Sequence, residues 1–267
     1  MNSLIENYLQ DGWIGPLPVL DDSEAKNFEI EIRKLDKKYD LMNSDYRCKS
    51  NVLFPLIDNL CRNTNIINYV RLLIGEDFHA WDTMLWFKKA KDKKKVSFHQ
   101  DATYWNFDNK HNALTVWYAV TDSLYFSGAL QYVTGSHKLN QQNHNDIKLK
   151  NNLLMRGQTV DYEIDILDQP EVHQGQCLIH SPYIIHGSQE NEDDHDRLAI
   201  GMMFVSTLCK PIATYSPEST VMINGIDRYN YMLHDPSPIG DWDIDFKNWK
   251  KAYDRQHINY YKMNING

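Results

Sequence analysis

The stretch Phe98–Trp105, FHQDATYW, sets a histidine and an aspartate two residues apart in a segment that otherwise has the composition of a β-strand. Alternate side chains of a strand point to the same face, so His99 and Asp101 are expected to point together into whatever that face encloses. A buried face accommodates an imidazole and a carboxylate only when polar partners offset their lost hydration. The stretch therefore predicts a polar site inside a β-structure.

Short segments with strand character surround this stretch from about residue 81 onward. Turn residues separate them, as in TDSLYFSG (121–128) and VHQGQ (172–176), and this favours an antiparallel sandwich or barrel over βαβ units. Apolar residues at alternate positions of 160–166 are typical of a half-buried strand. The expected strands are 83–89, 96–101, 113–120, 128–133, 160–166, 176–181 and 198–205.

Helical patterns lie on either side of this region. The expected helices are 3–10, 24–35 with Asp22 or Ser23 as its cap, 55–61, 66–74 and an amphipathic helix over about 246–261. No linker rich in Pro, Gly or Ser interrupts the chain. We therefore expect a single domain over 1–267, with a helical part over about 1–80, a β core over about 81–210 and a C-terminal extension over about 211–267.

Charge and composition exclude several classes of protein. The net charge is −8, and the densest basic run, KKAKDKKK (88–95), is expected to be a solvated hairpin tip, with the role of Lys88 left open. A constitutive nucleic-acid-binding protein normally has a basic face. No apolar run is long enough to cross a bilayer, no secretory signal opens the sequence, and the four cysteines lack CxxC spacing. We expect reduced thiols in a cytoplasmic protein.

Two histidines and one carboxylate are the ligand set of facial non-heme iron sites. His99 and Asp101 can supply two of these ligands, and the candidates for the third are His173, His180 and His186. Antiparallel pairing of the segments around His186 and Arg197 would place these two residues opposite each other. A buried arginine requires an anionic partner, so the cavity is expected to take a dicarboxylate such as 2-oxoglutarate, with one end on the metal and the other on Arg197.

The remaining histidines are expected to have structural roles. In apolar strands a histidine is more often a hydrogen-bonded core residue than a ligand. This expectation covers His79, His137, His173 and His180, whereas His111, His144 and His195 are expected at the surface.

The motif HQD, then HGS and an arginine eleven residues after the second histidine, resembles the phytanoyl-CoA dioxygenase family of iron(II)/2-oxoglutarate oxygenases. The resemblance extends over most of the chain and includes GALQYVTGSHK (128–138). HQDATYW (99–105) and NNLLMRGQ (151–158) are similar to a bacterial subgroup of small-molecule hydroxylases.

The resemblance implies a mainly β fold with flanking helices, a double-stranded β-helix of the cupin-like jelly-roll type. It implies iron(II), 2-oxoglutarate and O2 as cofactor and cosubstrates, with His99, Asp101 and His186 as the iron ligands. It assigns Arg197 and Ser188 to the distal carboxylate of 2-oxoglutarate. It places Gln100, Trp117 and Met84 along the cosubstrate pocket.

The function that the resemblance implies is hydroxylation of an aliphatic carbon, with release of succinate and CO2. The expected substrate is a small polar metabolite such as an amino acid, an aminophosphonate or a biosynthetic intermediate, and its identity stays open. Tyr104, Trp105 and Arg156 are the candidate substrate-binding residues. The expected partner is this small molecule, with neither nucleic acid nor membrane, and the sequence does not indicate an oligomeric state.

Three alternatives stay open at this point. A cupin-like protein could bind a metal and a ligand without turnover, and the same three ligands could hold the zinc of a hydrolase. The same oxygenase scaffold could also perform desaturation, demethylation or halogenation. In halogenases that resemble the family a small residue replaces the carboxylate ligand, so Asp101 favours hydroxylation.

Overall fold

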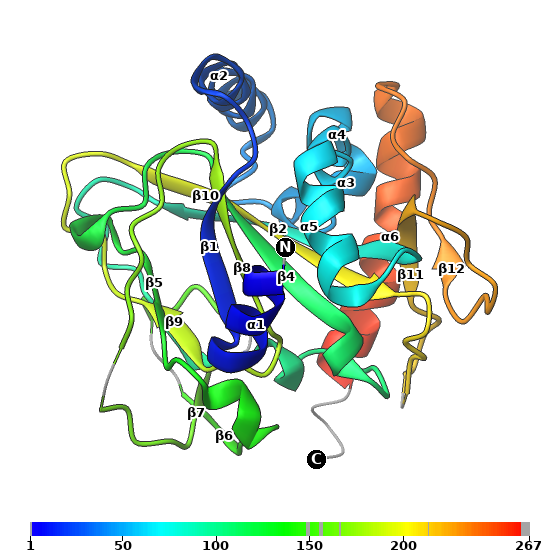
Figure 1. Ribbon diagram of the computed structural model, residues 1–267. Helices are drawn as coiled ribbons and strands as arrows, with labels where there is room; N and C mark the ends of the chain where they lie inside the picture. The colour runs from blue at the N-terminus through cyan, green and yellow to red at the C-terminus, as the bar shows by residue number, and fades with distance from the viewer. Residues whose placement is uncertain (1, 148–149, 155–156, 166, 213, 263–267) are drawn as a thin grey trace. The chain divides into compact units, whose positions relative to one another are not determined.

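The computed structural model describes residues 2–147, 150–154, 157–165, 167–212 and 214–262 (Figure 1). By its internal contacts the chain divides into two compact units. The first comprises Met1–Glu29, Trp86–Trp105 and Trp117–Ile200, and the second comprises Ile30–Leu85, Asn106–Val116 and Gly201–Gly267. A single domain over 1–267 stays a prediction.

The described strands form a seven-stranded sheet in the order β1-β8-β4-β10-β2-β11-β12, a three-stranded sheet β3-β9-β5 and a two-stranded ribbon β6-β7. With the helices beside them they give the mainly β, double-stranded β-helix fold that was expected. Their bounds are β1 Trp13–Pro18, β2 Phe78–Lys88, β3 Val96–His99, β4 Ala113–Ala119, β5 Leu130–Tyr132, β6 His144–Asp146, β7 Gln158–Val160, β8 Gln176–His180, β9 His186–Ser188, β10 Arg197–Ser206, β11 Ser219–Asn224 and β12 Leu233–His234.

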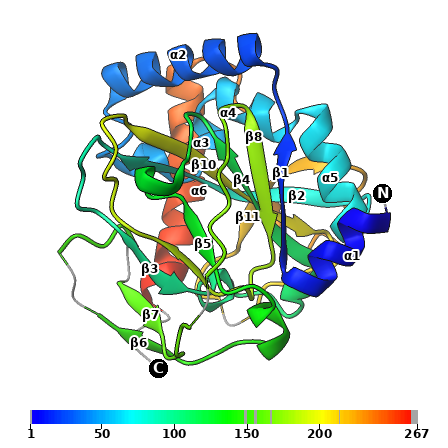
Figure 2. The same ribbon diagram turned by 60° about the vertical axis from the view of Figure 1, so that its left-hand side comes forward.

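The core of the first unit lies between its two main sheets. Buried side chains from β4, β8 and β10 on one side meet those of β5 on the other, and the ribbon β6-β7 packs beside β3 (Figure 2). The core residues are Trp117, Ala119, Leu130, Tyr132, Val172, Leu178, Ile184 and Ala199. This apolar layer supports the inner face of the small sheet.

All five expected helices form. The helices are α1 Asn2–Asp11, α2 Asp22–Tyr39, α3 Ser50–Leu53, α4 Pro55–Cys61, α5 Thr64–Ile74 and α6 Trp242–Lys262. The cap of α2 is Asp21, not Asp22 or Ser23: Oδ1 of Asp21 accepts from the Glu24 backbone N–H at 2.8 Å, and Glu24 accepts from the Asp21 N–H at 3.1 Å. This reciprocal capping box satisfies two backbone donors at once.

The prediction of a strand over 160–166 is wrong for the residues of this range that the structure describes. Strand β7 ends at Val160, and Tyr162 is exposed. Its partner strand β6 comprises only His144–Asp146, and the last pair between the two strands joins His144 to Val160. Alternating apolar residues form a strand only where a neighbouring strand can receive their hydrogen bonds. Residue 166 lies outside the described residues.

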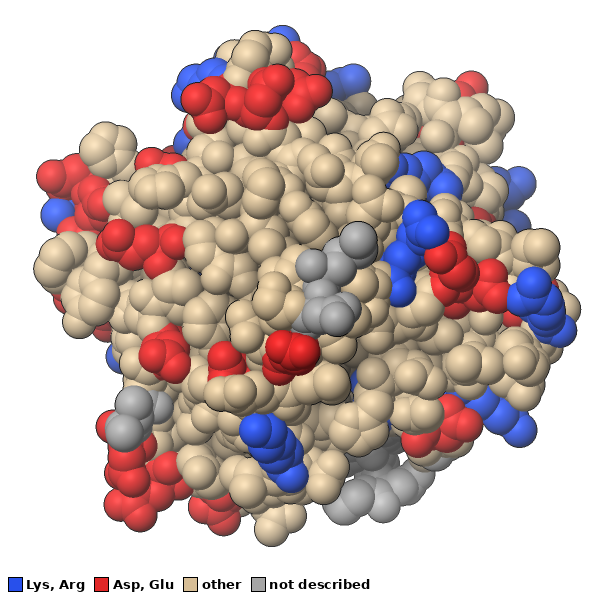
Figure 3. Space-filling model, viewed as in Figure 1, with Lys and Arg blue, Asp and Glu red and all other residues tan. Residues whose placement is uncertain are grey.

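Two further observations bear on the sequence-based expectations. All four cysteines are buried and free, and within the described residues the helices include none that is long and apolar enough to span a membrane. On the described residues of the face in Figure 3, acidic and basic side chains are interspersed, without a continuous basic band.

Candidate active site

Three of the predicted site residues converge in the first unit. Strands β3 and β9 pair with His99 opposite His186, and Asp101 starts a 3-10 helix just after β3. The Asp101 Oδ1 atom lies 3.4 Å from His99 Nε2 and 3.7 Å from His186 Nε2. All three residues are buried, and one ligand atom from each lies within 4.8 Å of the others.

Hydrogen bonds orient both imidazoles as ligands. His99 Nδ1 lies 2.9 Å from the Ser97 carbonyl oxygen, and His186 Nδ1 lies 3.1 Å from that of Ile184. A carbonyl oxygen only accepts, so each Nδ1 carries a proton, and the Nε2 atom of each ring is the one that faces Asp101. Burial, and then the neighbouring imidazoles, hold the pKa of His186 well below its usual range, so the ring stays neutral.

A third imidazole, which we expected in the core, borders the same carboxylate. His180 Nε2 lies 3.4 Å from Asp101 Oδ2, and the His180 Nδ1 lies 2.9 Å from the Tyr132 hydroxyl. Burial raises the pKa of Tyr132, so its hydroxyl keeps the proton that it can donate to Nδ1. Burial alone would raise the pKa of Asp101, but the imidazoles around it, His186 first, hold that pKa well below its usual range. The carboxylate is therefore ionised.

Two buried cations lie beside this cluster. Lys88 Nζ donates to Ser188 Oγ at 2.7 Å and to the Gln189 carbonyl, while Arg197 donates from Nη2 to the Gly128 carbonyl at 3.1 Å. Within the described part of the chain, neither side chain has a carboxylate within ion-pair distance, and Arg197 Nε has no hydrogen-bond partner. Burial, and then repulsion from Arg197, lower the pKa of Lys88 to about 5, and burial lowers that of Arg197 to about 10.

Arg197 lies on a different sheet from the one that the sequence suggested. The expected antiparallel pairing of His186 with Arg197 is wrong, because β9 belongs to the three-stranded sheet and β10 to the seven-stranded one. The polar segment between them crosses from one sheet to the other. The guanidinium carbon of Arg197 lies 5.6 Å from the centre of the Trp117 ring on the neighbouring strand β4.

The other predicted cosubstrate-pocket residues have different surroundings. The Gln100 amide donates to the carbonyls of Asn140 and Tyr183 at 2.9 and 2.6 Å, and its oxygen accepts from Gln141 and the Gln142 backbone. These bonds use its full hydrogen-bonding capacity to hold two loops. Met84 is on β2 in the second unit, where it forms a bridge with Cys48. Cosubstrate contacts of Gln100 and Met84 stay predictions.

The candidate substrate residues are described in part. The Tyr104 ring centre lies 5.9 Å from that of His99, and Trp105 is buried close by in sequence. Arg156 lies outside the described residues. Substrate contacts by all three stay predictions.

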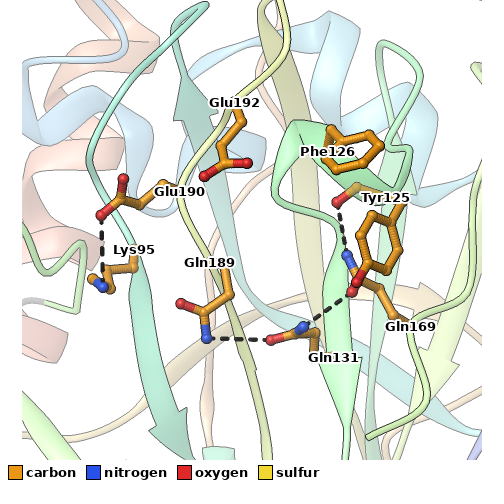
Figure 4. Close-up of a pocket in the computed structure, with 8 residues that line it drawn as sticks. All are labelled: Lys95, Tyr125, Phe126, Gln131, Gln169, Gln189, Glu190 and Glu192. Carbon is orange, nitrogen blue, oxygen red and sulfur yellow. Dashed lines mark hydrogen bonds and ion pairs between the residues drawn. The ribbon is translucent and has the colours of Figure 1, made fainter.

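A polar pocket of about 480 Å³ also opens in the first unit. Its lining includes three glutamines in a hydrogen-bonded chain: Gln189 donates to Gln131, Gln131 to Gln169, and Gln169 to the Tyr125 carbonyl (Figure 4). Gln131 pairs with Gly187 on β9, which is the residue next to His186. Because successive residues of a strand point to opposite faces, the Gln131 side chain lies on the face of the small sheet opposite to that of His186. The pocket is therefore separate from the cluster of His99, Asp101 and His186.

The cluster fits a metal of the iron type. Two neutral imidazole nitrogens and one ionised carboxylate oxygen are the donors of facial iron(II) sites, and such a set leaves coordination positions for a cosubstrate and dioxygen. The sequence predicted all three residues. His180 was among the candidates for the third ligand before it was assigned to the core, and its contact with Asp101 was not expected. The hydrogen bond between Tyr132 and His180 was not expected either.

A protein-family comparison matches residues 10–199 to a model described as Phytanoyl-CoA dioxygenase (PhyH). The curated relatives include the human peroxisomal phytanoyl-CoA dioxygenase, 25% identical over 231 residues, which covers 76% of this chain and 67% of that protein. They also include ectoine dioxygenase of Nocardia farcinica, 21% identical over 245 residues, which covers 81% of this chain and 82% of that protein.

Solved structures share the fold. The chain matches the apo form of ThoJ, a non-heme monooxygenase, with a TM-score of 0.88 and 23% identity over 99% of this chain and 100% of that one. It also matches CytC3 with Fe(II) and alpha-ketoglutarate, with a TM-score of 0.63 and 17% identity over 89% of this chain and 93% of that one.

Proposed function

Because the chain belongs to the phytanoyl-CoA dioxygenase family, we propose that His99, Asp101 and His186 hold its iron(II) and that it hydroxylates an aliphatic carbon of a small polar metabolite. Membership makes the chain an iron(II)- and 2-oxoglutarate-dependent dioxygenase. The proposal concerns the residues of the site and the class of substrate.

The pair of buried cations supports the proposed cosubstrate site. Ser188 accepts a hydrogen bond from Lys88. It lies two residues beyond His186 on the same face of β9, so about 7 Å separates the two residues along the strand at the usual rise per residue. This separation suits a short dicarboxylate with one end at the metal and the other between Lys88 and Arg197. Two buried basic side chains without an acidic partner are costly to hold in their charged forms unless an anion joins them. We assign the distal carboxylate of 2-oxoglutarate to this position.

When bound, iron and 2-oxoglutarate supply an oxidative decarboxylation that yields succinate and CO2 and activates dioxygen toward a C–H bond. The residues of the chain bind and orient the reactants. Asp101 contributes an ionised carboxylate oxygen, and the two imidazoles contribute nitrogens whose direction the carbonyls of Ser97 and Ile184 set. The apolar layer behind Tyr132 keeps bulk water from the inner face of the small sheet.

The relatives and one side chain support a small polar substrate. Of the two relatives described above, this chain covers more of ectoine dioxygenase, which is named for a small polar molecule. The other relative is named for an acyl-CoA. Tyr104 brings an amphipathic ring to within 5.9 Å of His99, between the centres of the two rings. Such a ring can contact both the carbon skeleton and a polar group of a small metabolite.

An anaerobic titration with iron(II) and 2-oxoglutarate tests the site. The wild-type protein should develop the weak visible charge-transfer band of the iron chelate. Arg197→Ala should bind iron but need about 10–100 times more 2-oxoglutarate, because a charged hydrogen-bonding partner is lost. The control is Arg71→Ala, which removes a surface arginine paired with Glu76 at 2.6 Å. Full 2-oxoglutarate affinity in Arg197→Ala would refute the assignment.

A substrate screen tests the second half of the proposal. Succinate release, measured with a panel of amino acids, aminophosphonates and acyl-CoA thioesters, should rise with one of the small polar compounds, and mass spectrometry should find a gain of one oxygen atom. Turnover of acyl-CoA thioesters alone would contradict the proposed substrate class while leaving the iron site in place.

A further inference from the structure

A second group of metal-ligating side chains lies in the second unit. His79 is near the start of β2, His234 ends β12, and Asp227 lies in the loop between β11 and β12 (Figure 1). Asp227 Oδ2 lies 2.9 Å from His234 Nε2 and 3.6 Å from His79 Nε2. One ligand atom from each residue lies within 4.8 Å of the others, as in the cluster of the first unit.

The His79 imidazole is fully buried, and among the residues that the structure describes neither of its ring nitrogens has a hydrogen-bond partner. A buried polar group without a partner is costly and is uncommon in folded proteins. The sequence led us to expect a hydrogen-bonded core histidine here. Its Nε2 instead faces the Asp227 carboxylate from beyond hydrogen-bond distance, which leaves room for a third atom between them.

The sheet register places a further polar group on the same face. Met222 of β11 pairs with His79, and Thr220 of β11 pairs with His234. Paired residues of neighbouring strands, and alternate residues of one strand, share a face. His79, Thr220 and His234 therefore point to one side of this part of the sheet. The Thr220 hydroxyl is also buried, and it has no hydrogen-bond partner in the described ranges of the chain.

The loop that carries Asp227 is held in place independently of the histidines. Asp227 Oδ1 accepts from the backbone N–H groups of Tyr229 and Asn230 at 2.9 and 3.0 Å. Asp77 accepts from the Ile226 N–H at 2.9 Å and pairs with Arg228. One carboxylate oxygen of Asp227 is thus anchored, and the other faces both imidazoles.

We propose that His79, Asp227 and His234 form a second metal site, which takes a divalent cation of the zinc type. Two imidazole nitrogens and one carboxylate oxygen are common zinc ligands, and a fourth, solvent-derived ligand would complete a tetrahedron. The His234 side chain is 42% exposed, so ions and water have access to the site. The bound ion would join the start of β2, the loop at 225–230 and β12 into one cross-linked region.

The probe for this site is Zn(II) itself. Metal-free protein is dialysed against buffered Zn(II), and the bound zinc per chain is counted by mass spectrometry. His234→Asn should bind one equivalent fewer than the wild-type protein. The matched control is His195→Asn, because His195 also lies beside a carboxylate, 3.2 Å from Asp193 Oδ1, but belongs to no group of three metal ligands within the described part of the chain. This control should bind as much zinc as the wild-type protein.

A second variant separates this proposal from the iron site. In His99→Ala, which removes a proposed iron ligand, Zn(II) should still raise the melting temperature by several degrees, and His99→Ala/His234→Asn should lose that shift. X-ray absorption of zinc-loaded His99→Ala should show two imidazoles in the first coordination shell. Equal zinc binding by the wild type and His234→Asn, or no zinc binding by His99→Ala, would overturn the second site. Failure of the iron assignment would change only the total number of bound ions.

Discussion

His180 Nε2 lies as close to Asp101 as His99 Nε2 does, at 3.4 Å, but it approaches the other carboxylate oxygen, Oδ2. Asp101 Oδ1 faces the two histidines of the proposed iron site, so the opposite side of the carboxylate has its own buried imidazole. That imidazole is held in turn by the Tyr132 hydroxyl at 2.9 Å. A ligand carboxylate restrained on its outer oxygen keeps its inner oxygen directed toward the metal.

We expect His180→Phe to weaken iron(II) binding by about 10–100-fold, which is the usual cost of losing an outer partner of a metal ligand. Tyr132→Phe should have a smaller effect in the same direction, since only the group that orients His180 is lost. Anaerobic iron(II) titration measures both. Unchanged iron affinity in both variants would contradict a positioning role, and complete loss of iron in His180→Phe would make His180 a ligand.

Lys88→Met should have opposite effects on the ligand-free protein and on cosubstrate binding. Without an anion, burial holds the pKa of Lys88 near 5, so folding near pH 7 must remove a proton that the unfolded chain keeps. Replacement by methionine removes this cost and should raise the melting temperature of the ligand-free protein. The same change should weaken 2-oxoglutarate binding by about 10–100-fold, because a charged donor is lost. Thermal unfolding with and without 2-oxoglutarate measures both. The exposed neighbour Lys89 provides the control, and Lys89→Met should change neither.

The stability gained in Lys88→Met should depend on pH. The pKa of Lys88 is about 5 in the folded protein and 10.5 as a free side chain. Between these values the unfolded chain binds a proton that the folded chain does not, so wild-type stability rises with pH, by at most about 1.4 kcal/mol per unit. The advantage of Lys88→Met should therefore shrink from pH 6 to pH 9. A constant difference in unfolding free energy would contradict the depressed pKa.

Binding of 2-oxoglutarate should take up a proton near pH 7. A carboxylate beside Lys88 favours the ammonium form and so raises the pKa from about 5. Calorimetry in two buffers of different ionisation enthalpy should find about one proton taken up per ligand by the wild-type protein, and none by Lys88→Met. Equal uptake by both proteins would place the proton on another group.

Gly187→Ala should disturb the metal site more than the fold. A Cβ at Gly187 would lie 2.9 Å from the Val96 carbonyl oxygen and 3.1 Å from the Phe98 ring, both on β3. Relief of this contact pushes β3 away from β9 and so separates His99 from His186. We expect a loss of about 1–3 kcal/mol in unfolding free energy and at least tenfold weaker iron(II) binding. Normal iron affinity with normal circular dichroism would show that the strands adjust without moving the ligands.

Local patterns explain why much of the site was predictable. Strand periodicity predicted that His99 and Asp101 would point together, although β3 ends at His99 and Asp101 begins a 3-10 helix. The helices follow from apolar spacing. The motifs around His186 and Arg197 added the family. Local patterns failed at 160–166, where apolar alternation was present but the partner strand was too short.

The sequence by itself determined the candidate side chains: a His-x-Asp pair in a strand-like segment, a distant histidine and an arginine that needs an anion. Only the tertiary structure decided their partners. It placed Arg197 in a different sheet from His186, and it brought Lys88 into contact with Ser188. It also brought His180 to the second oxygen of Asp101, and His79 to Asp227 and His234. The physical reason is that strand periodicity is local, whereas sheet membership and burial arise from pairing between segments far apart in the chain, which no local pattern encodes.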